Sequence, residues 1–199
     1  HATDYGRDQL NRLSTVTQTT GASTLVTTYQ YDAQDSLITV TDPKGLQNIY
    51  TNSDTGWRLT ASTPDAGSMT YTYDAAGNVL TSTDTVPVAI GRTYDSMNRL
   101  LTVVYPNSSL NVTYSYDAVD SPPGTYFNVG HRTLMADSSG AAAYHYDRRG
   151  LLRSEEKTVG ARRYVTAYEY DKTGNLTQVR FPTESPILRQ GQADFTYDA

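Results

Sequence analysis

Residues 71–78 read Tyr71-Thr72-Tyr73-Asp74-Ala75-Ala76-Gly77-Asn78, and this stretch decides the fold. Tyr71 and Tyr73 alternate, which places both rings on one face of an extended strand. Asp74 and Gly77 are turn residues, because an aspartate can bind the amides of its own turn and glycine accepts a left-handed backbone. Residues 79–83 are apolar and then rich in Ser and Thr. The stretch therefore predicts an antiparallel β-hairpin.

The same pattern recurs along the chain. Tyr-Asp pairs begin at residues 31, 73, 94, 116, 146, 170 and 197, and degenerate copies begin at 7 and 52. Successive anchors lie about 21 residues apart, with longer spacings where residues are inserted. A periodicity of this length predicts a repeat protein in which each repeat is one hairpin.

Each repeat has a tyrosine anchor, an aromatic residue two positions earlier, an aspartate one position later and a glycine or turn-tolerant residue four positions later. Of the 17 tyrosines, only Tyr105, Tyr126 and Tyr164 lie outside the two aromatic positions, which favours packing within the sheet over stacking on sugar rings. The predicted motif residues are Tyr29, Tyr31, Asp32, Gly56, Tyr71, Tyr73, Asp74, Gly77, Tyr94, Asp95, Tyr114, Tyr116, Asp117, Tyr144, Tyr146, Asp147, Gly150, Tyr168, Tyr170, Asp171 and Gly174.

An isolated hairpin is marginally stable in water, so successive hairpins must pack side by side. We expect an all-β fold with very little helix, in which tandem antiparallel hairpins form a curved, spiralling sheet. Residues 1–199 are predicted to be a single array of about nine repeats, truncated at both ends. The longest spacing contains residues 121–130 (SPPGTYFNVG), which we interpret as a loop inserted in a hairpin turn.

Composition excludes several classes of partner. The net charge is −5 and no Lys/Arg cluster stands out, which argues against nucleic acid and anionic membranes. No apolar stretch is long enough to cross a bilayer and no leader precedes the repeats, so we expect no membrane insertion and an export signal elsewhere in a longer parent protein. The chain has no cysteine, which excludes disulfides and thiolate metal sites.

The repeat resembles that of the Rhs/YD-repeat family, with its Tyr-x-Tyr-Asp-x-x-Gly-Arg/Asn-Leu unit. Residues 71–78 and 168–176 match this unit closely, and its copies cover nearly the whole chain. The resemblance implies a β-sheet that spirals into a hollow shell. In bacterial Rhs effectors and in the C subunits of insecticidal toxin complexes, such a shell encloses a C-terminal toxin; animal teneurins use a similar shell in adhesion.

The bacterial members also carry a self-cleaving aspartyl protease after the repeats, with two Asp-Pro-x-Gly motifs about one repeat apart. Residues 42–45 (Asp42-Pro43-Lys44-Gly45) match one motif, but the next equivalent reads Thr63-Pro64-Asp65-Ala66-Gly67. A two-carboxylate mechanism would need an aspartate at position 63. We therefore interpret Asp42 as a turn residue and expect no self-cleavage within these residues.

No other enzyme chemistry is predicted. The sequence has no Gly-x-Ser-x-Gly nucleophile motif and no glycine-rich phosphate loop. His131 and His145 lack a partner at metal-ligand spacing. We expect no catalytic residue, no metal and no cofactor.

The preferred interpretation is a structural shell segment of a secreted or surface-displayed protein, which encloses a C-terminal toxin for delivery in bacterial competition or virulence. Its partners would be the remainder of the shell and the enclosed polypeptide. The alternative is a secreted or cell-surface carbohydrate-binding or adhesion module. In that case Tyr126 and Phe127 are the candidate contacts for a surface glycan.

Overall fold

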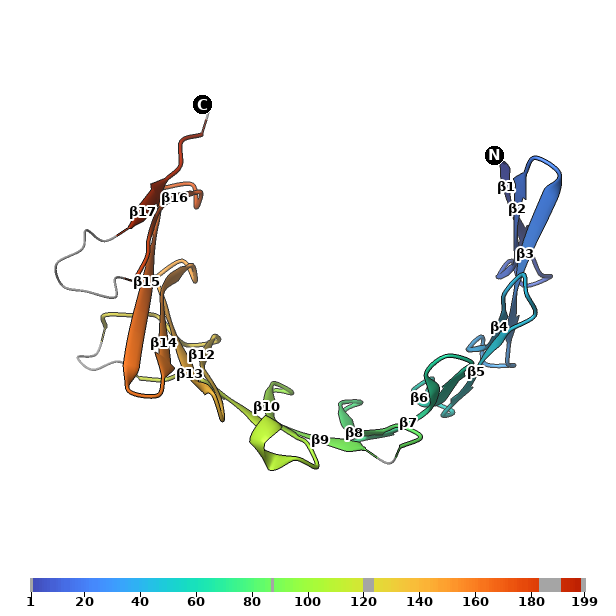
Figure 1. Cartoon of the computed structure of the whole chain (residues 1–199), viewed down its shortest axis with the longest axis horizontal. Helices are drawn as coiled ribbons and strands as arrows, with labels where there is room; N and C mark the ends of the chain where they lie inside the picture. The colour runs from blue at the N-terminus through green and yellow to red at the C-terminus, as the bar shows by residue number, and fades with distance from the viewer. Residues whose placement is uncertain (1, 87, 120–123, 183–190, 198–199) are drawn as a thin grey trace. The chain divides into compact units, whose positions relative to one another are not determined.

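The computed structural model of the chain describes residues 2–86, 88–119, 124–182 and 191–197, and Figure 1 shows them as strands joined by short turns. Within these ranges the only helical element is the 3-10 helix η1 (Ser108–Leu110). The strands are β1 (Ala2–Arg7), β2 (Leu13–Thr20), β3 (Ser23–Tyr31), β4 (Leu37–Thr41), β5 (Gln47–Asn52), β6 (Arg58–Thr63), β7 (Gly67–Tyr73), β8 (Val79–Thr83), β9 (Ala89–Tyr94), β10 (Leu100–Val104), β11 (Val112–Tyr116), β12 (Arg132–Asp137), β13 (Gly140–Tyr146), β14 (Leu152–Val159), β15 (Arg162–Tyr170), β16 (Leu176–Arg180) and β17 (Gln192–Asp194).

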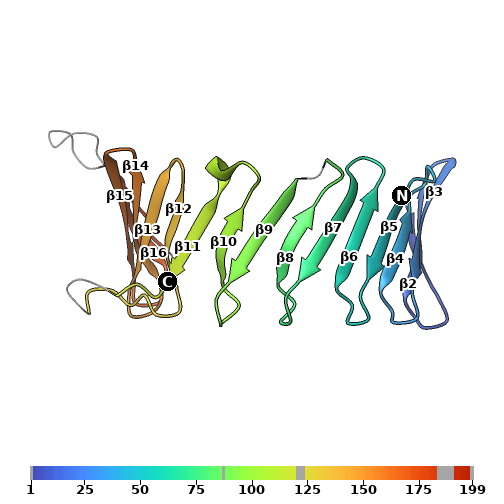
Figure 2. The ribbon, with the colours of Figure 1, turned by 90° about the horizontal axis from the view of Figure 1, so that it is seen from below.

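Strands that follow one another in sequence are hydrogen-bonded neighbours, and their pairing is antiparallel, as the row of arrows in Figure 2 shows. The chain divides into two compact units, residues 1–92 and 93–199, with the division inside β9. Within the first unit the strands follow a gradual bend (Figure 1). The predicted all-β fold of tandem antiparallel hairpins is confirmed. The single truncated array and its inserted loop at 121–130 stay predictions.

The Asp-x-x-Gly segment closes each hairpin by a fixed set of bonds. In the turn between β7 and β8, the Asp74 amide donates to the Asn78 carbonyl over 3.0 Å, and the Gly77 amide donates to the Asp74 carbonyl over 3.1 Å. The Asp74 carboxylate accepts from the Ala76 and Asn78 amides, each at 2.9 Å. Gly77 has a φ of 87°, in the left-handed region that glycine adopts without strain. One aspartate and one glycine thus satisfy the backbone of the whole turn.

The pairing register shifts at the anchor residue. In the hairpin of β7 and β8, Thr72 pairs with Thr81 but Tyr73 pairs with Val79, so Leu80 is the extra residue of a β-bulge. The shift recurs at residues 7, 31, 52, 116, 146 and 170. A bulge increases local twist and leaves part of the ladder unpaired, so each repeat needs a further bond beside its anchor.

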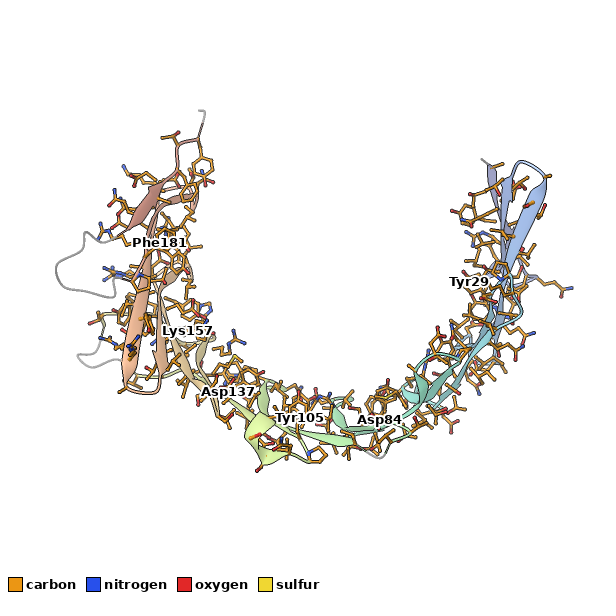
Figure 3. The ribbon with its side chains drawn as sticks, viewed as in Figure 1. Tyr29, Asp84, Tyr105, Asp137, Lys157 and Phe181 are labelled. Carbon is orange, nitrogen blue, oxygen red and sulfur yellow. The ribbon has the colours of Figure 1, made fainter. Side chains whose placement is uncertain are left out.

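The sheet has no second layer over either face in the described residues. Ala142 and Val179 are the buried apolar residues there, and the motif tyrosines of β3 to β16 are half-buried. Figure 3 shows side chains extending from both faces of the ribbon. Bonds between neighbouring strands therefore carry much of the cohesion that a core supplies elsewhere.

Two turns are absent from the sequence prediction. Gly21, between β2 and β3, and Gly160, between β14 and β15, have φ values of 60° and 57° and join their strands with two-residue turns. Neither turn contains aspartate or proline, which explains why the search for turn residues missed them. No helix in the described part of the chain is long and apolar enough to cross a membrane.

Candidate functional site

The anchor tyrosines form a ladder of hydroxyl bonds between successive hairpins. The hydroxyl groups of six anchor tyrosines each donate to a backbone carbonyl of the preceding repeat, over distances between 2.6 and 3.0 Å. The donor and acceptor residues are Tyr31 and Leu13, Tyr73 and Arg58, Tyr116 and Leu100, Tyr146 and Arg132, Tyr170 and Leu152, and Tyr197 and Leu176. The anchor therefore satisfies a carbonyl at the position where the bulge disturbs the regular ladder.

Asn52 shows that this bond, rather than the aromatic ring, is the common feature of the anchor. Asn52 replaces tyrosine in its repeat, and its side-chain amide donates to the Leu37 carbonyl over 3.2 Å. Its carbonyl oxygen also accepts from Nε of Arg58 at 2.9 Å. The degenerate repeat therefore keeps the link to the preceding hairpin.

In three repeats, a planar side chain five residues after the anchor packs on the tyrosine of the next repeat. The Arg12 guanidinium lies 4.7 Å from the Tyr31 ring centroid, and Arg99 lies 4.3 Å from that of Tyr116. Trp57 takes this role toward Tyr73, with centroids 5.3 Å apart. Cation–π and aromatic contacts of this kind add to the hydroxyl bond between repeats.

The two arginines also link successive turns through carboxylates. Arg99 binds Asp95 of its own turn and Asp117 of the next, each at 2.7 Å. The Arg99 side-chain bond is the main cause that lowers the pKa of Asp117, and the backbone amide of Arg99 does most to lower the pKa of Asp95. Arg12 joins Asp8 and Asp35 in the same way.

Two turn aspartates, Asp74 and Asp171, have lowered pKa values because their carboxylates accept hydrogen bonds within their own turns. The Asn78 side chain is the main cause that lowers the pKa of Asp74. The Thr173 hydroxyl, followed by backbone and side-chain bonds from Asn175, lowers the pKa of Asp171 to about 2. Because these carboxylates are already bound to their own turns, they are poorly placed to act as general acids near neutral pH.

Asp42 adopts this same turn geometry on the opposite edge of the hairpins. Its carboxylate accepts from the Lys44 and Leu46 amides at 2.8 Å, and its own amide donates to the Leu46 carbonyl at 2.9 Å. Thr63, at the equivalent position one repeat later, accepts from the Ala66 amide over 3.1 Å. The Asp-Pro-x-Gly segment here is a hairpin turn.

The other predicted motif residues take regular places. Gly56, Gly150 and Gly174 have positive φ like Gly77. The aromatic residues two positions before the anchor pair across the hairpin: Tyr29 with Val40, Tyr71 with Ser82, Tyr114 with Met135, Tyr144 with Glu155, and Tyr168 with Val179. Tyr94 ends β9, and Asp32 and Asp147 close turns as Asp74 does.

Asp117 departs from this pattern because the connection from β11 to β12 is longer. Asp117 itself has a φ of 60°, and its carboxylate accepts from the Gly130 amide at 2.6 Å. Asn128 is buried and replaces the missing turn contacts: its side chain donates to the Ala118 carbonyl and accepts from the Tyr146 amide. Asp120, four positions after the Tyr116 anchor, lies outside the described residues.

Tyr126 and Phe127 lie on this connection but have different surroundings. The Tyr126 ring packs on His145, with centroids 4.3 Å apart, and the Arg153 guanidinium lies 6.0 Å from it. Phe127 is 38% exposed, and its amide donates to the Tyr146 carbonyl. One face of Tyr126 is thus covered by protein. Both residues stay predicted contacts only, and nothing in the structure or its relatives supports a glycan ligand.

Sequence reasoning missed the arginines around this connection. Arg148 lies over Phe127 at 5.2 Å from the ring centroid, and Arg148, Arg149 and Arg153 line a hollow of about 450 Å³ together with Thr125 and Phe127. The signal was present, since no other repeat has arginine at these positions. Among the described residues, no group of three or more His, Asp and Glu could hold a metal ion.

The fold and the ladder define a class: an all-β protein built from hairpin repeats that anchor tyrosines join edge to edge. The RHS Repeat family model matches residues 16–47 and 53–86, both in the first unit. These matches bear out the motif resemblance in residues 16–47 and 53–86, about a third of the chain. The predicted resemblance to the Rhs/YD-repeat family is therefore confirmed over these residues.

Solved toxin-complex structures are similar in fold. The TcdB2-TccC3 complex aligns with a TM-score of 0.76, 18% identity and coverage of 90% of this chain and 11% of that chain. A TcdB2-TccC3-Cdc42 structure gives 0.75 at the same identity and coverage, and a Tc holotoxin pore of Photorhabdus luminescens gives 0.73, with 10% of that chain covered. The chain thus spans about a tenth of the length of these neighbours. No curated protein sequence matches it.

Proposed function

We propose that this chain is a segment of a structural shell, part of a longer secreted or surface-displayed protein that encloses a C-terminal toxin. The observation that supports this best is the hydroxyl ladder. It joins successive hairpins through a bond that recurs at six tyrosine anchors and at Asn52. Such an array grows by adding repeats and has no need of a compact core.

The chain's contribution is physical containment. A wall of continuous sheet leaves few free edges and separates an enclosed polypeptide from its surroundings. The turn aspartates serve hairpin closure, which supports a non-catalytic role for the segment. The partners we propose are the neighbouring repeats of the parent shell and the enclosed polypeptide, and the setting is toxin delivery in bacterial competition or virulence.

Protease protection of the downstream polypeptide in the intact parent protein tests this proposal. In the native parent, we expect that polypeptide to be digested much more slowly than the same polypeptide expressed alone. Replacing Tyr31 and Tyr73 together by phenylalanine removes two rungs of the ladder and should speed its digestion. The matched control is Tyr105→Phe, at a tyrosine outside the anchors.

Two results would count against containment. Equal digestion rates in the native parent and in the isolated polypeptide would show that the repeats do not shield it. Faster digestion in the Tyr105→Phe control, to the same extent as in the ladder variant, would show that the ladder has no special part in the wall.

A further inference from the structure

The repeat that begins at Tyr146 differs from the others in its charge. The two residues after its turn aspartate are Arg148 and Arg149, where the repeat at Tyr73 has two alanines. Its bulge residue is the charged Arg153, whereas the other described bulges have an uncharged residue there: Ser14, Ile38, Leu59, Leu80, Thr133 or Thr177. The hairpin closes equally well with alanine at the turn positions, so the fold does not require these three arginines.

The three arginines converge on one surface. Together with Thr125 and Phe127 they line the hollow of about 450 Å³, which we call the arginine hollow. Phe127 enters this surface only because the long connection from β11 to β12 folds back on the turn after β13, where its amide donates to the Tyr146 carbonyl. The two departures from the repeat, the long connection and the arginines, therefore meet at one place.

Two of the three guanidinium groups in the arginine hollow have no carboxylate partner within the ranges that the structure describes. Arg149 is held by Asp147 at 3.1 Å and by the Asp171 carbonyl at 2.6 Å. Arg148 and Arg153 lie against the rings of Phe127 and Tyr126, and no carboxylate of the described residues lies within 4.0 Å of either. A guanidinium stacked on a ring keeps its in-plane N–H groups free, and these suit bidentate bonds to carboxylates.

The basic surface continues beyond this hollow. A second hollow of about 390 Å³ shares Arg149 and Arg153 and extends to Tyr168 and Arg180. Arg153 belongs to β14 and Arg180 to β16, and two strand spacings make about 10 Å. The small side chain of Ala167 lies opposite Arg180 on the strand between them. The surface is thus elongated and larger than one small anion needs.

We propose that this surface binds an acidic polypeptide segment in extended conformation. Acidic residues at alternate positions of an extended chain present carboxylates about 7 Å apart on one side, a spacing that arginine side chains can bridge. Charge complementarity selects this partner. Four arginines face the two hollows; Arg149 and Arg180 are ion-paired with Asp147 and Glu169, which leaves the charges of Arg148 and Arg153 for a ligand. The aromatic rings hold the guanidiniums in place, which lowers the entropy lost on binding.

Fluorescence anisotropy with a labelled ten-residue peptide of alternating Glu and Thr, titrated with the full chain, tests the proposal. We expect saturable binding that weakens as salt rises toward about 150 mM, because the charges are near the surface. The double variant Arg148→Gln with Arg153→Gln should weaken binding about tenfold or more, through loss of charge-assisted bonds. Arg162→Gln removes an equally exposed charge from the tip of β15 and should leave the affinity within about twofold.

The matched peptide of alternating Gln and Thr should not bind. Circular dichroism of each variant shows whether it keeps the sheet, and the variants' turns have no structural need of the lost side chains. The proposal is overturned if the acidic peptide fails to bind, or if both arginine variants lower affinity equally. It is also overturned if inorganic phosphate displaces the peptide at equal concentration, or if oligothymidylate of equal charge binds as tightly.

Discussion

Replacing Tyr73 by phenylalanine isolates one rung of the hydroxyl ladder. The substitution removes the 2.6 Å bond to the Arg58 carbonyl but keeps the ring that packs on Trp57 with centroids 5.3 Å apart. A hydrogen bond between neutral groups contributes about 1 kcal/mol net, and the half-buried carbonyl can regain part of this from water. We therefore expect Tyr73→Phe to lower the free energy of unfolding by about 1 kcal/mol.

Urea denaturation followed by circular dichroism measures this change, with Tyr105→Phe as the matched control. Tyr73→Leu should cost about a further 1 kcal/mol, because it also removes the aromatic contact with Trp57. The reasoning is refuted if Tyr73→Phe and Tyr105→Phe have the same small effect. It is also refuted if the cost appears only in Tyr73→Leu, since the ring alone would then explain the anchor.

Three further predictions concern the turns. Gly77→Ala should lower the free energy of unfolding by about 1 to 2 kcal/mol in a urea titration, because residue 77 has a φ of 87° and a Cβ would lie 3.1 Å from Trp57. The pKa of Asp171 is lowered to about 2, so its ionised carboxylate stabilises the fold fully above pH about 4 and loses this effect as the pH falls toward 2. The native chain should therefore have a higher urea midpoint than Asp171→Asn at neutral pH, and the difference should shrink between about pH 4 and pH 2. Arg99→Lys loses the bonds to both Asp95 and Asp117 and the stacking on Tyr116. It should therefore lower the urea midpoint more than the control Arg162→Lys does, and this difference should become smaller in high salt, which screens the ion pairs.

The hairpins were predictable because local chemistry determines them. Asp74 and Gly77 show a turn in the sequence, and alternation of Tyr71 with Tyr73 shows a strand, so the structure has both where the pattern placed them. The hydroxyl ladder was not predictable, because each acceptor is a backbone carbonyl 14 to 21 residues earlier that becomes available only through the bulge. For the same reason, the sequence does not show that Asn52 can replace the anchor tyrosine by donating a hydrogen bond to the Leu37 carbonyl.

The surroundings of Tyr126 also depended on the fold. The sequence indicated that this segment interrupts the repeat. It did not indicate that the Tyr126 ring would pack on His145 or that Phe127 would contact Arg148. These contacts join residues about 20 positions apart across a connection whose path no local rule fixes. The charge of Arg153 at a bulge position could be read from the sequence, but only the structure shows that Arg153 lines the arginine hollow.

Cryo-electron microscopy of the intact parent protein tests the central claim most directly. The account predicts that these hairpins continue into the flanking repeats as one sheet, with the anchor tyrosines bonded between neighbours and the downstream polypeptide on the enclosed side. A parent in which the repeats form no enclosure, or in which the downstream polypeptide lies outside the sheet, would contradict it.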